Sequence, residues 1–270
     1  MRDAQDVPTQ ELIDRAEVTA LQDPTCDSDE YWVLVRALHG RNEDIVFQAA
    51  SSWCDSSEVL LRCLGSDVLG QLGYGSFYPF TDRSEPILAS LLSDPDASVV
   101  SSALDALGHL SAGDPTAIEA CSNHESAEVR ESVAFCLSSH DDALSRATLI
   151  ILTTDPDSDV RDWATWGLGT MSELDTPEIR EALLLRLAVE NEEVRGEAMR
   201  GLATRGDSRA IPVILEELNQ EEVDLDAIKA AAELPDRSFL SQLEGLLEEN
   251  PEDADIKRAL ERCRAEQPRV

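Results

Sequence analysis

The chain has 270 residues, of which 42% are hydrophobic and only 4% aromatic. This composition supports a folded core of aliphatic side chains and excludes a wholly disordered chain. The formal net charge of −33 repels phosphate backbones and anionic lipids, so nucleic-acid binding is disfavoured. Such a charge fits solubility or a salty cytoplasm, and it also fits attraction to a basic partner; both interpretations stay open.

The N-terminal segment MRDAQDVPTQELIDRAE lacks the apolar stretch of a secretory signal, and no apolar run reaches the length of a membrane span. We therefore expect a cytoplasmic protein that does not enter a membrane. The six cysteines lie at irregular spacings without a C-x-x-C pair, and the four histidines are scattered. These patterns predict buried thiols in a reducing compartment, and we expect no metal site and no cofactor.

Two pairs of apolar helices are predicted before residue 74. The first pair is TQELIDRAEVTAL with EYWVLVRALHG, and the second is EDIVFQAASSWC with SSEVLLRCLGSDVLGQLG. The next stretch, GYGSFYPFTDRS, holds half of all Phe and Tyr residues, and its Gly and Pro exclude a regular helix. It fits either a loop that folds back over the helices or a docking loop for a partner. Its aromatic residues are Tyr74, Phe77, Tyr78 and Phe80.

The middle of the chain repeats one pattern, in which an apolar helix, an acidic turn and a second amphipathic helix follow one another. Each second helix begins with Val and carries small or apolar residues at offsets 4, 7 and 8, which share one helical face. The Asp, Ser and Asn residues of the acidic turns are good N-caps. The predicted starts of the second helices are Val99, Val129, Val160, Val194 and Val223.

A last pair of helices near the C-terminus is highly charged, as expected of a unit that caps a repeat array. We therefore predict one repeat domain over residues 1–270. Its approximate units are 8–40, 43–73, 84–111, 114–140, 141–172, 175–206, 207–234 and 237–264.

The acidic turn followed by Val-Arg, at Arg130, Arg161 and Arg195, resembles the HEAT-repeat family, in particular the phycobilin-lyase HEAT-like repeat. The chain is similar to small stand-alone bacterial HEAT-repeat proteins of unassigned function. This resemblance covers nearly the whole chain and implies an all-α fold, a right-handed α-α superhelical solenoid of about eight helical pairs. It also implies that the three arginines lie near neighbouring acidic turns and have a structural role.

In solenoids of this family the second helices line the concave groove. Positions six residues after each predicted start then form a row that runs from acidic, through aromatic, to basic, with Asp67 before it. Helical offsets place Trp163 toward the packed side, and Asp162 with Trp166 toward the groove. A chance alignment of surface residues would produce the same row. The predicted partner-binding residues are Asp105, Glu131, Phe135, Asp162, Trp166 and Arg200.

The sequence contains no Walker loop, nucleophile elbow or dinucleotide fingerprint, and we assign no catalytic residue. We predict a non-catalytic scaffold that binds a protein partner, for which a basic surface would fit, along the groove. The alternative is a HEAT-like enzyme, either a DNA-base glycosylase or a phycobilin-lyase-type subunit. A glycosylase would resemble this chain in having an Asp with an aromatic residue in the groove, yet it needs basic walls to hold DNA.

Overall fold

The computed structural model describes residues 7–41, 44–73, 78–188 and 191–266. Helices make up 72% of the structure, and the described ranges contain no strand. The predicted all-α fold is therefore confirmed. In the same ranges no helix combines the length and the apolar composition that crossing a membrane requires.

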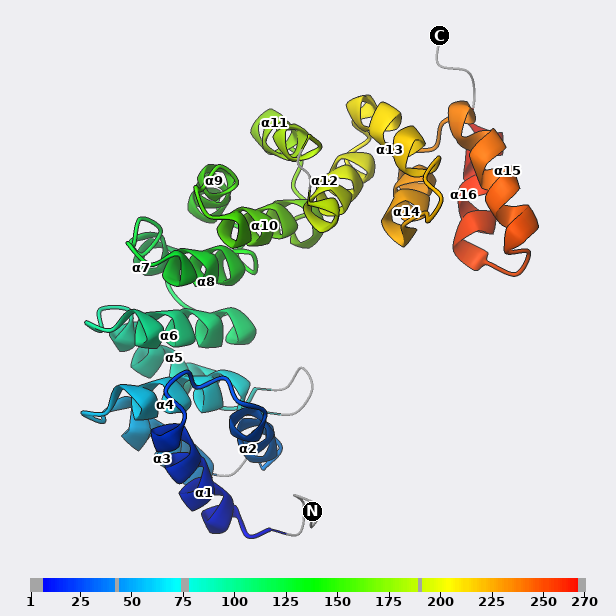
Figure 1. The fold of residues 1–270 in the computed structure, drawn as a ribbon. Coiled ribbons are helices and arrows are strands. Elements are labelled where there is room, and N and C mark those ends of the chain that lie inside the picture. Colours follow the sequence, from blue (N-terminus) through cyan, green and yellow to red (C-terminus); the bar gives the residue numbers. More distant parts are fainter. Residues whose placement is uncertain (1–6, 42–43, 74–77, 189–190, 267–270) are drawn as a thin grey trace. The chain divides into compact units, whose positions relative to one another are not determined.

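The chain divides into two compact units, residues 1–148 and residues 149–270, and the division falls inside α9 (Ala143–Leu152). Figure 1 shows the order of the helices in each unit. The helices of unit 1 are α1 (Thr9–Gln22), α2 (Asp29–His39), α3 (Asp44–Cys54), α4 (Val59–Gln71), α5 (Thr81–Leu91), α6 (Ala97–Leu110), α7 (Pro115–Glu119) and α8 (Ala127–Leu137).

Unit 1 is built of two layers. Helices α2, α4, α6 and α8 follow one another in one layer, with α4, α6 and α8 side by side, while α1, α3, α5 and α7 pack against them (Figure 1). The backbones of α4 and α6 approach closely at Gly70, where a Cβ atom would lie 2.5 Å from the Cα atom of Ala106. Stacking of consecutive helical pairs is the packing of an α-α solenoid.

Unit 2 repeats this arrangement. Its helices are α10 (Ser158–Trp166), the π-helix η2 (Gly167–Met171), α11 (Pro177–Arg186), α12 (Glu192–Thr204), η3 (Ser208–Ala210), α13 (Ile211–Glu217), α14 (Leu225–Glu233), η4 (Arg237–Phe239), α15 (Leu240–Glu249) and α16 (Ala254–Ala265). Helices α10, α12, α14 and α16 contact one another in sequence order, and α11, α13 and α15 pack against this row. The predicted solenoid architecture is thus present in both units.

The predicted starts of the second helices agree with the structure to within two residues. Helices α6, α8, α10 and α12 begin two residues before their predicted valines. Helix α14 begins at Leu225, so Val223 lies outside it. Asp224 is the reason, because its side chain accepts a hydrogen bond from the backbone N–H of Asp226 and fixes the N-terminus there.

The arginines of the Val-Arg motif have the structural role that we expected. Arg130 and Arg161 each donate hydrogen bonds to two carbonyl oxygens of the turn that precedes their own helix. Arg195 pairs with Glu217 of α13 at 2.8 Å. The contacts of Arg130 and Arg161 join an acidic turn to the helix that follows it. The contact of Arg195 joins α12 to α13.

Candidate functional site: an acidic strip and a tryptophan pair

Three neighbouring helices of unit 1 each contribute one half-buried carboxyl group: Asp67 of α4, Asp105 of α6 and Glu131 of α8. We call these three residues the acidic strip. The charge of Asp105 acts on Asp67, and that of Glu131 acts on Asp105. The structure therefore brings together two predicted groove residues and Asp67, the position expected before them.

Of Asp67 and Asp105, Asp67 has the carboxyl group whose pKa is raised further. Burial raises the pKa of its carboxyl group to about 8, and the charges of Cys63 and Asp105 act in the same direction. The hydroxyl group of Tyr31 donates to Oδ2 of Asp67 at 2.5 Å, which opposes this rise only in part. Tyr31 is fully buried, so this contact links α2 to the strip.

Asp105 shows the same effect. Burial raises the pKa of its carboxyl group to about 7, and Glu131 and Glu128 raise it further, although a hydrogen bond with Ser132 lowers it. At neutral pH the strip therefore retains protons that exposed carboxyl groups would have lost. A cation placed beside it would favour the ionised forms, so the arrangement is suited to binding positive charge.

Phe135 lies on the same helix as Glu131, one turn further along. Its ring contacts the ring of His109 edge to face, with 5.1 Å between the centroids. A Cβ atom on Gly108 would lie 2.7 Å from Cε1 of Phe135, so this glycine makes room for the ring. Phe135 is half-buried and packs against α6.

In unit 2 the two tryptophans of α10 form a pair. The rings of Trp163 and Trp166 meet edge to face with 5.3 Å between their centroids, and both side chains are half-buried. The two side chains fall in the same exposure class, and the orientation of Trp166 toward a groove stays a prediction. Residues three apart on a helix are neighbours, which accounts for the contact between the two rings.

The other two predicted residues of unit 2 have partners of their own. Asn191 donates from Nδ2 to Oδ2 of Asp162 at 3.0 Å, and burial raises the pKa of Asp162. Arg200 forms an ion pair with Asp226 of α14 at 3.2 Å. Three predicted groove residues thus lie in each unit, and a continuous row through both units stays a prediction.

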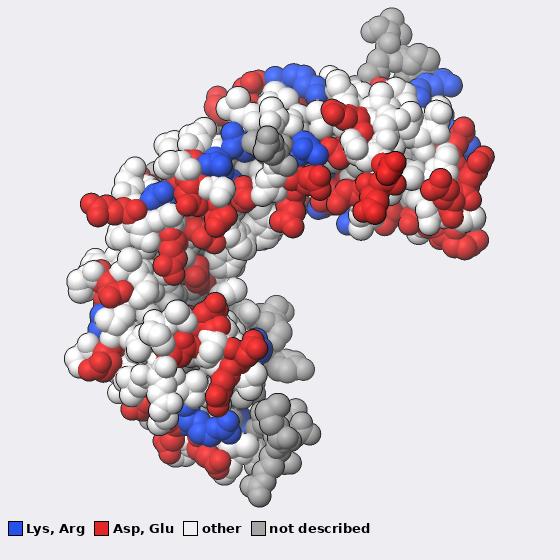
Figure 2. All heavy atoms as spheres, in the orientation of Figure 1, with Lys and Arg blue, Asp and Glu red and all other residues white. Residues whose placement is uncertain are grey.

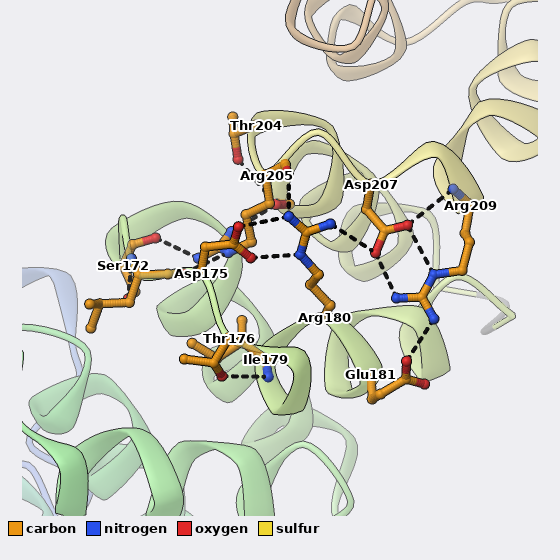
Figure 3. Close-up of polar contacts among 12 residues, drawn as sticks. Ser172, Asp175, Thr176, Ile179, Arg180, Glu181, Thr204, Arg205, Asp207 and Arg209 are labelled. Carbon is orange, nitrogen blue, oxygen red and sulfur yellow. Dashed lines mark hydrogen bonds and ion pairs between the residues drawn. The ribbon is translucent and has the colours of Figure 1, made fainter. Parts of the chain in front are cut away.

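The segment that follows Trp166 is held by a buried arginine. Arg205, which is only 9% exposed, donates to five backbone carbonyl oxygens, and Figure 3 shows it beside Ser172. Its acceptors are the carbonyl groups of Leu168, Gly169, Ser172, Leu174 and Gly201. Because most of these groups lie in or just after η2, Arg205 fixes the end of the helix that carries the tryptophan pair.

A chain of ion pairs continues from this point (Figure 3). Arg180 lies between Asp175, at 2.6 Å, and Asp207, at 3.5 Å, and Arg209 contacts both Asp207 and Glu181. Hydrogen bonding from Arg209 lowers the pKa of Asp207 to about 2. The sequence analysis did not find this cluster, because its members come from three segments that share no repeated motif.

The aromatic stretch after α4 is described only in part. Tyr74 and Phe77 lie outside the described residues. Phe80 stacks on Phe47 of α3 at 5.2 Å, and the guanidinium group of Arg83 lies 3.9 Å from the centroid of the Phe47 ring. Tyr78 is half-buried. Helix α5 begins at Thr81, so the last four residues of the stretch are helical, contrary to our expectation.

Acidic side chains are spread over the face drawn in Figure 2, on the helices of both units, whereas lysines and arginines form smaller groups. This distribution agrees with the net charge of −33. Within the strip, Asp67 and Asp105 are distinguished by pKa values that burial raises to about 8 and about 7.

Comparison with known families and structures defines the class of protein. Residues 86–113, in unit 1, match the HEAT repeat, and residues 194–220, in unit 2, match the PBS lyase HEAT-like repeat. The two matched segments are similar to HEAT and HEAT-like repeats, in agreement with the resemblance that the sequence pattern predicted.

It is homologous to protein YibA of Escherichia coli K12, with 29% identity over 237 residues, which cover 85% of this chain and 84% of YibA. The crystal structure of the E. coli YibA protein matches 97% of this chain and 94% of that one, with a TM-score of 0.75 and 27% identity. An engineered protein matches 94% of this chain and 79% of its own length, with a TM-score of 0.55 and 18% identity; this likeness shows the fold alone.

Proposed function

We propose that the protein is a non-catalytic scaffold and that the acidic strip of unit 1 binds a basic segment of a protein partner. The HEAT-repeat solenoid is a fold that commonly mediates protein interactions. One observation carries the proposal beyond the fold: Asp67 and Asp105 have pKa values raised to about 8 and about 7 by burial beside like charges.

A basic partner would relieve the unfavourable electrostatics of the strip. Lysine or arginine side chains placed against it would pair with the carboxyl groups and lower their pKa values, so binding would release protons near neutral pH. Phe135, one turn from Glu131, offers an aromatic contact beside the charged one. The acidic strip and Phe135 therefore offer a partner both charged groups and an aromatic contact.

Isothermal titration calorimetry with a short arginine-rich peptide tests this proposal. A peptide of equal length with glutamine in place of arginine controls for non-electrostatic binding. Asp105→Asn and Glu131→Gln remove charge from the strip and should each weaken binding of the arginine-rich peptide by about tenfold, which corresponds to about 1.4 kcal/mol.

Asp82→Asn is the matched control, because Asp82 is an exposed carboxyl group of α5 in the same unit. It changes the net charge by the same amount and should leave the affinity nearly unchanged. Equal weakening by Asp82→Asn and Asp105→Asn would mean that only the overall charge attracts the peptide. That result, or a failure of the arginine-rich peptide to bind, would refute a specific role for the strip.

A further inference from the structure

Two cysteines of unit 1 meet although they are far apart in the sequence. Cys26 lies in the turn between α1 and α2, and its sulfur atom is 3.8 Å from the carbonyl oxygen of Leu60 in α4. Cys63 is one turn beyond Leu60 on that helix, and the two thiol groups are near enough that each shifts the pKa of the other. The fold thus holds a dithiol between the first turn and α4.

The turn that carries Cys26 is held firmly. The carboxylate of Asp23 accepts hydrogen bonds from the backbone N–H groups of Thr25 and Ser28, at 3.1 and 2.9 Å. Cys26 itself has a φ angle of 52°, in the left-handed region that few side chains adopt. This conformation directs its side chain toward α4, where the Leu60 carbonyl and Cys63 lie.

The two thiols differ in exposure and in acidity. Cys63 is buried, with its sulfur 3.6 Å from Oγ of Ser98, whereas Cys26 is partly exposed. The neighbouring thiol of Cys26 lowers the pKa of Cys63 below that of an ordinary cysteine, which favours a thiolate at that position.

The other cysteines provide a contrast within the same chain. They are buried, and burial raises the pKa of each of their thiols, which makes them poor nucleophiles: Cys54, Cys121, Cys136 and Cys263. Within the described ranges, no three His, Cys, Asp or Glu side chains are arranged to hold a metal ion. The dithiol is therefore suited to sulfur chemistry of its own.

We propose that Cys26 and Cys63 form a reversible oxidation site that reacts with a hydroperoxide to give an intramolecular disulfide. This proposal does not rest on the proposed binding of a basic partner.

The chemistry balances with hydrogen peroxide as the oxidant. The Cys63 thiolate attacks one peroxide oxygen, the O–O bond breaks, and the products are a Cys63 sulfenic acid and hydroxide, which takes a proton to become water. The Cys26 sulfur then attacks the sulfenyl sulfur, the S–O bond breaks and the S–S bond forms. The departing hydroxide takes the Cys26 proton as a second water, and the two electrons given up by the sulfurs have reduced the peroxide. A dithiol reductant reverses the oxidation by exchange.

Thiol counting and peptide mapping test the proposal on the full-length protein. Reduced protein is exposed to hydrogen peroxide and denatured, and its free thiols are then alkylated. We expect two of the six thiols to be lost, a Cys26–Cys63 cross-linked peptide to appear, and dithiothreitol to restore all six. Retention of six thiols, or a cross-link between any other pair, would overturn the proposal.

Two variants test the order of the steps. In Cys26→Ser no resolving thiol remains, so a sulfenic acid should accumulate at Cys63 and be trapped there by dimedone. In Cys63→Ser neither a disulfide nor a dimedone adduct should form at Cys26. A dimedone adduct at Cys26 in that variant would contradict the assignment of Cys63 as the nucleophile. Circular dichroism establishes whether each variant is folded; if either is not, the wild-type cross-link decides.

Discussion

In unit 1 the carboxyl groups of Asp67 and Asp105 lie beside other acidic groups, whereas in unit 2 those of Asp175 and Asp207 lie beside arginines. The pKa values of the first two are raised by burial, and those of the second two are lowered by hydrogen bonds from guanidinium groups. Both units use the same stacked helical pairs. The comparison teaches that the repeat fixes the backbone, while the placement of arginines decides whether a carboxyl group is stabilised within the chain or is left to attract an outside cation.

The largest expected effect comes from removing the arginine that holds unit 2 together. Arg205→Met removes a donor from five backbone carbonyl oxygens, three of them in buried contacts, so it should lower the free energy of unfolding of unit 2 by about 3 kcal/mol or more. Hydrogen exchange resolved by residue should show this loss in α10 to α12 and no change in unit 1. Arg258→Ala is the control, because Arg258 is exposed and forms a surface ion pair with Glu233, and it should have little effect. Similar losses from both variants would show that the ion pairs, and not the carbonyl contacts, stabilise the unit.

Two glycine-to-alanine substitutions compare the effect of close helix packing on stability with the effect of helix propensity. Gly70→Ala places a Cβ atom 2.5 Å from the Cα atom of Ala106, so it should destabilise unit 1 by about 2–3 kcal/mol. Gly245→Ala in α15 of unit 2 meets no atom within 4 Å and should stabilise by about 0.5–1 kcal/mol, because alanine favours the helix. Urea denaturation measures both. A neutral result for Gly70→Ala would mean that α4 and α6 can separate without cost.

The tryptophan pair offers a comparison inside one helix. Trp163 and Trp166 are both half-buried and contact each other, so each substitution by alanine should cost about 2 kcal/mol, roughly half of the cost at a fully buried site. The double variant should cost less than the sum, because each single change already removes the ring contact. Thermal unfolding of the three variants gives the comparison, and strict additivity would show that the ring contact contributes nothing.

The smallest effect concerns pH and has opposite signs in the two units. Asp105 has a pKa of about 7 in the folded state against 3.8 as its reference, so the folded state binds more protons between these values and the stability of unit 1 should fall as the pH rises through them. Asp105→Asn should therefore stabilise unit 1 at pH 8 by about 1 kcal/mol after allowance for solvent screening. Asp207, with a pKa of about 2, stabilises unit 2 above pH 4, and this contribution should be lost as the pH falls toward 2. Unfolding curves at pH 3, 5 and 8 test both signs, and equal stability of wild type and Asp105→Asn at pH 8 would disprove the burial argument.

Much of the fold could be predicted from the sequence, because helical periodicity and capping are local properties. Four of the five predicted helix starts follow the observed ones by the same two residues, and the exception at Val223 follows from the capping side chain of Asp224. The structural role of Arg130 and Arg161 could also be predicted, since each contacts a turn only five or six residues away.

The site was harder to predict, because its properties depend on contacts between helices. The offset that identified Asp105 gave its place in the row, but the raised pKa depends on how α6 stacks on α4 and α8. Arg205 could not be found, since its acceptors lie up to 37 residues away in irregular backbone. The contact between Trp163 and Trp166 was also missed, because an angular offset does not take account of two rings that meet on adjacent turns.

The central claim is that the carboxyl groups of Asp67 and Asp105 keep their protons to a higher pH than exposed carboxyl groups until a cation approaches. Carboxyl carbon chemical shifts of Asp67 and Asp105, followed by NMR from pH 3 to pH 10 without and with the arginine-rich peptide, test it most directly. We expect midpoints near pH 8 and pH 7 in the free protein, and lower midpoints for both residues when the peptide is bound. Midpoints near pH 4 in the free protein, or midpoints that the peptide leaves in place, would contradict the account.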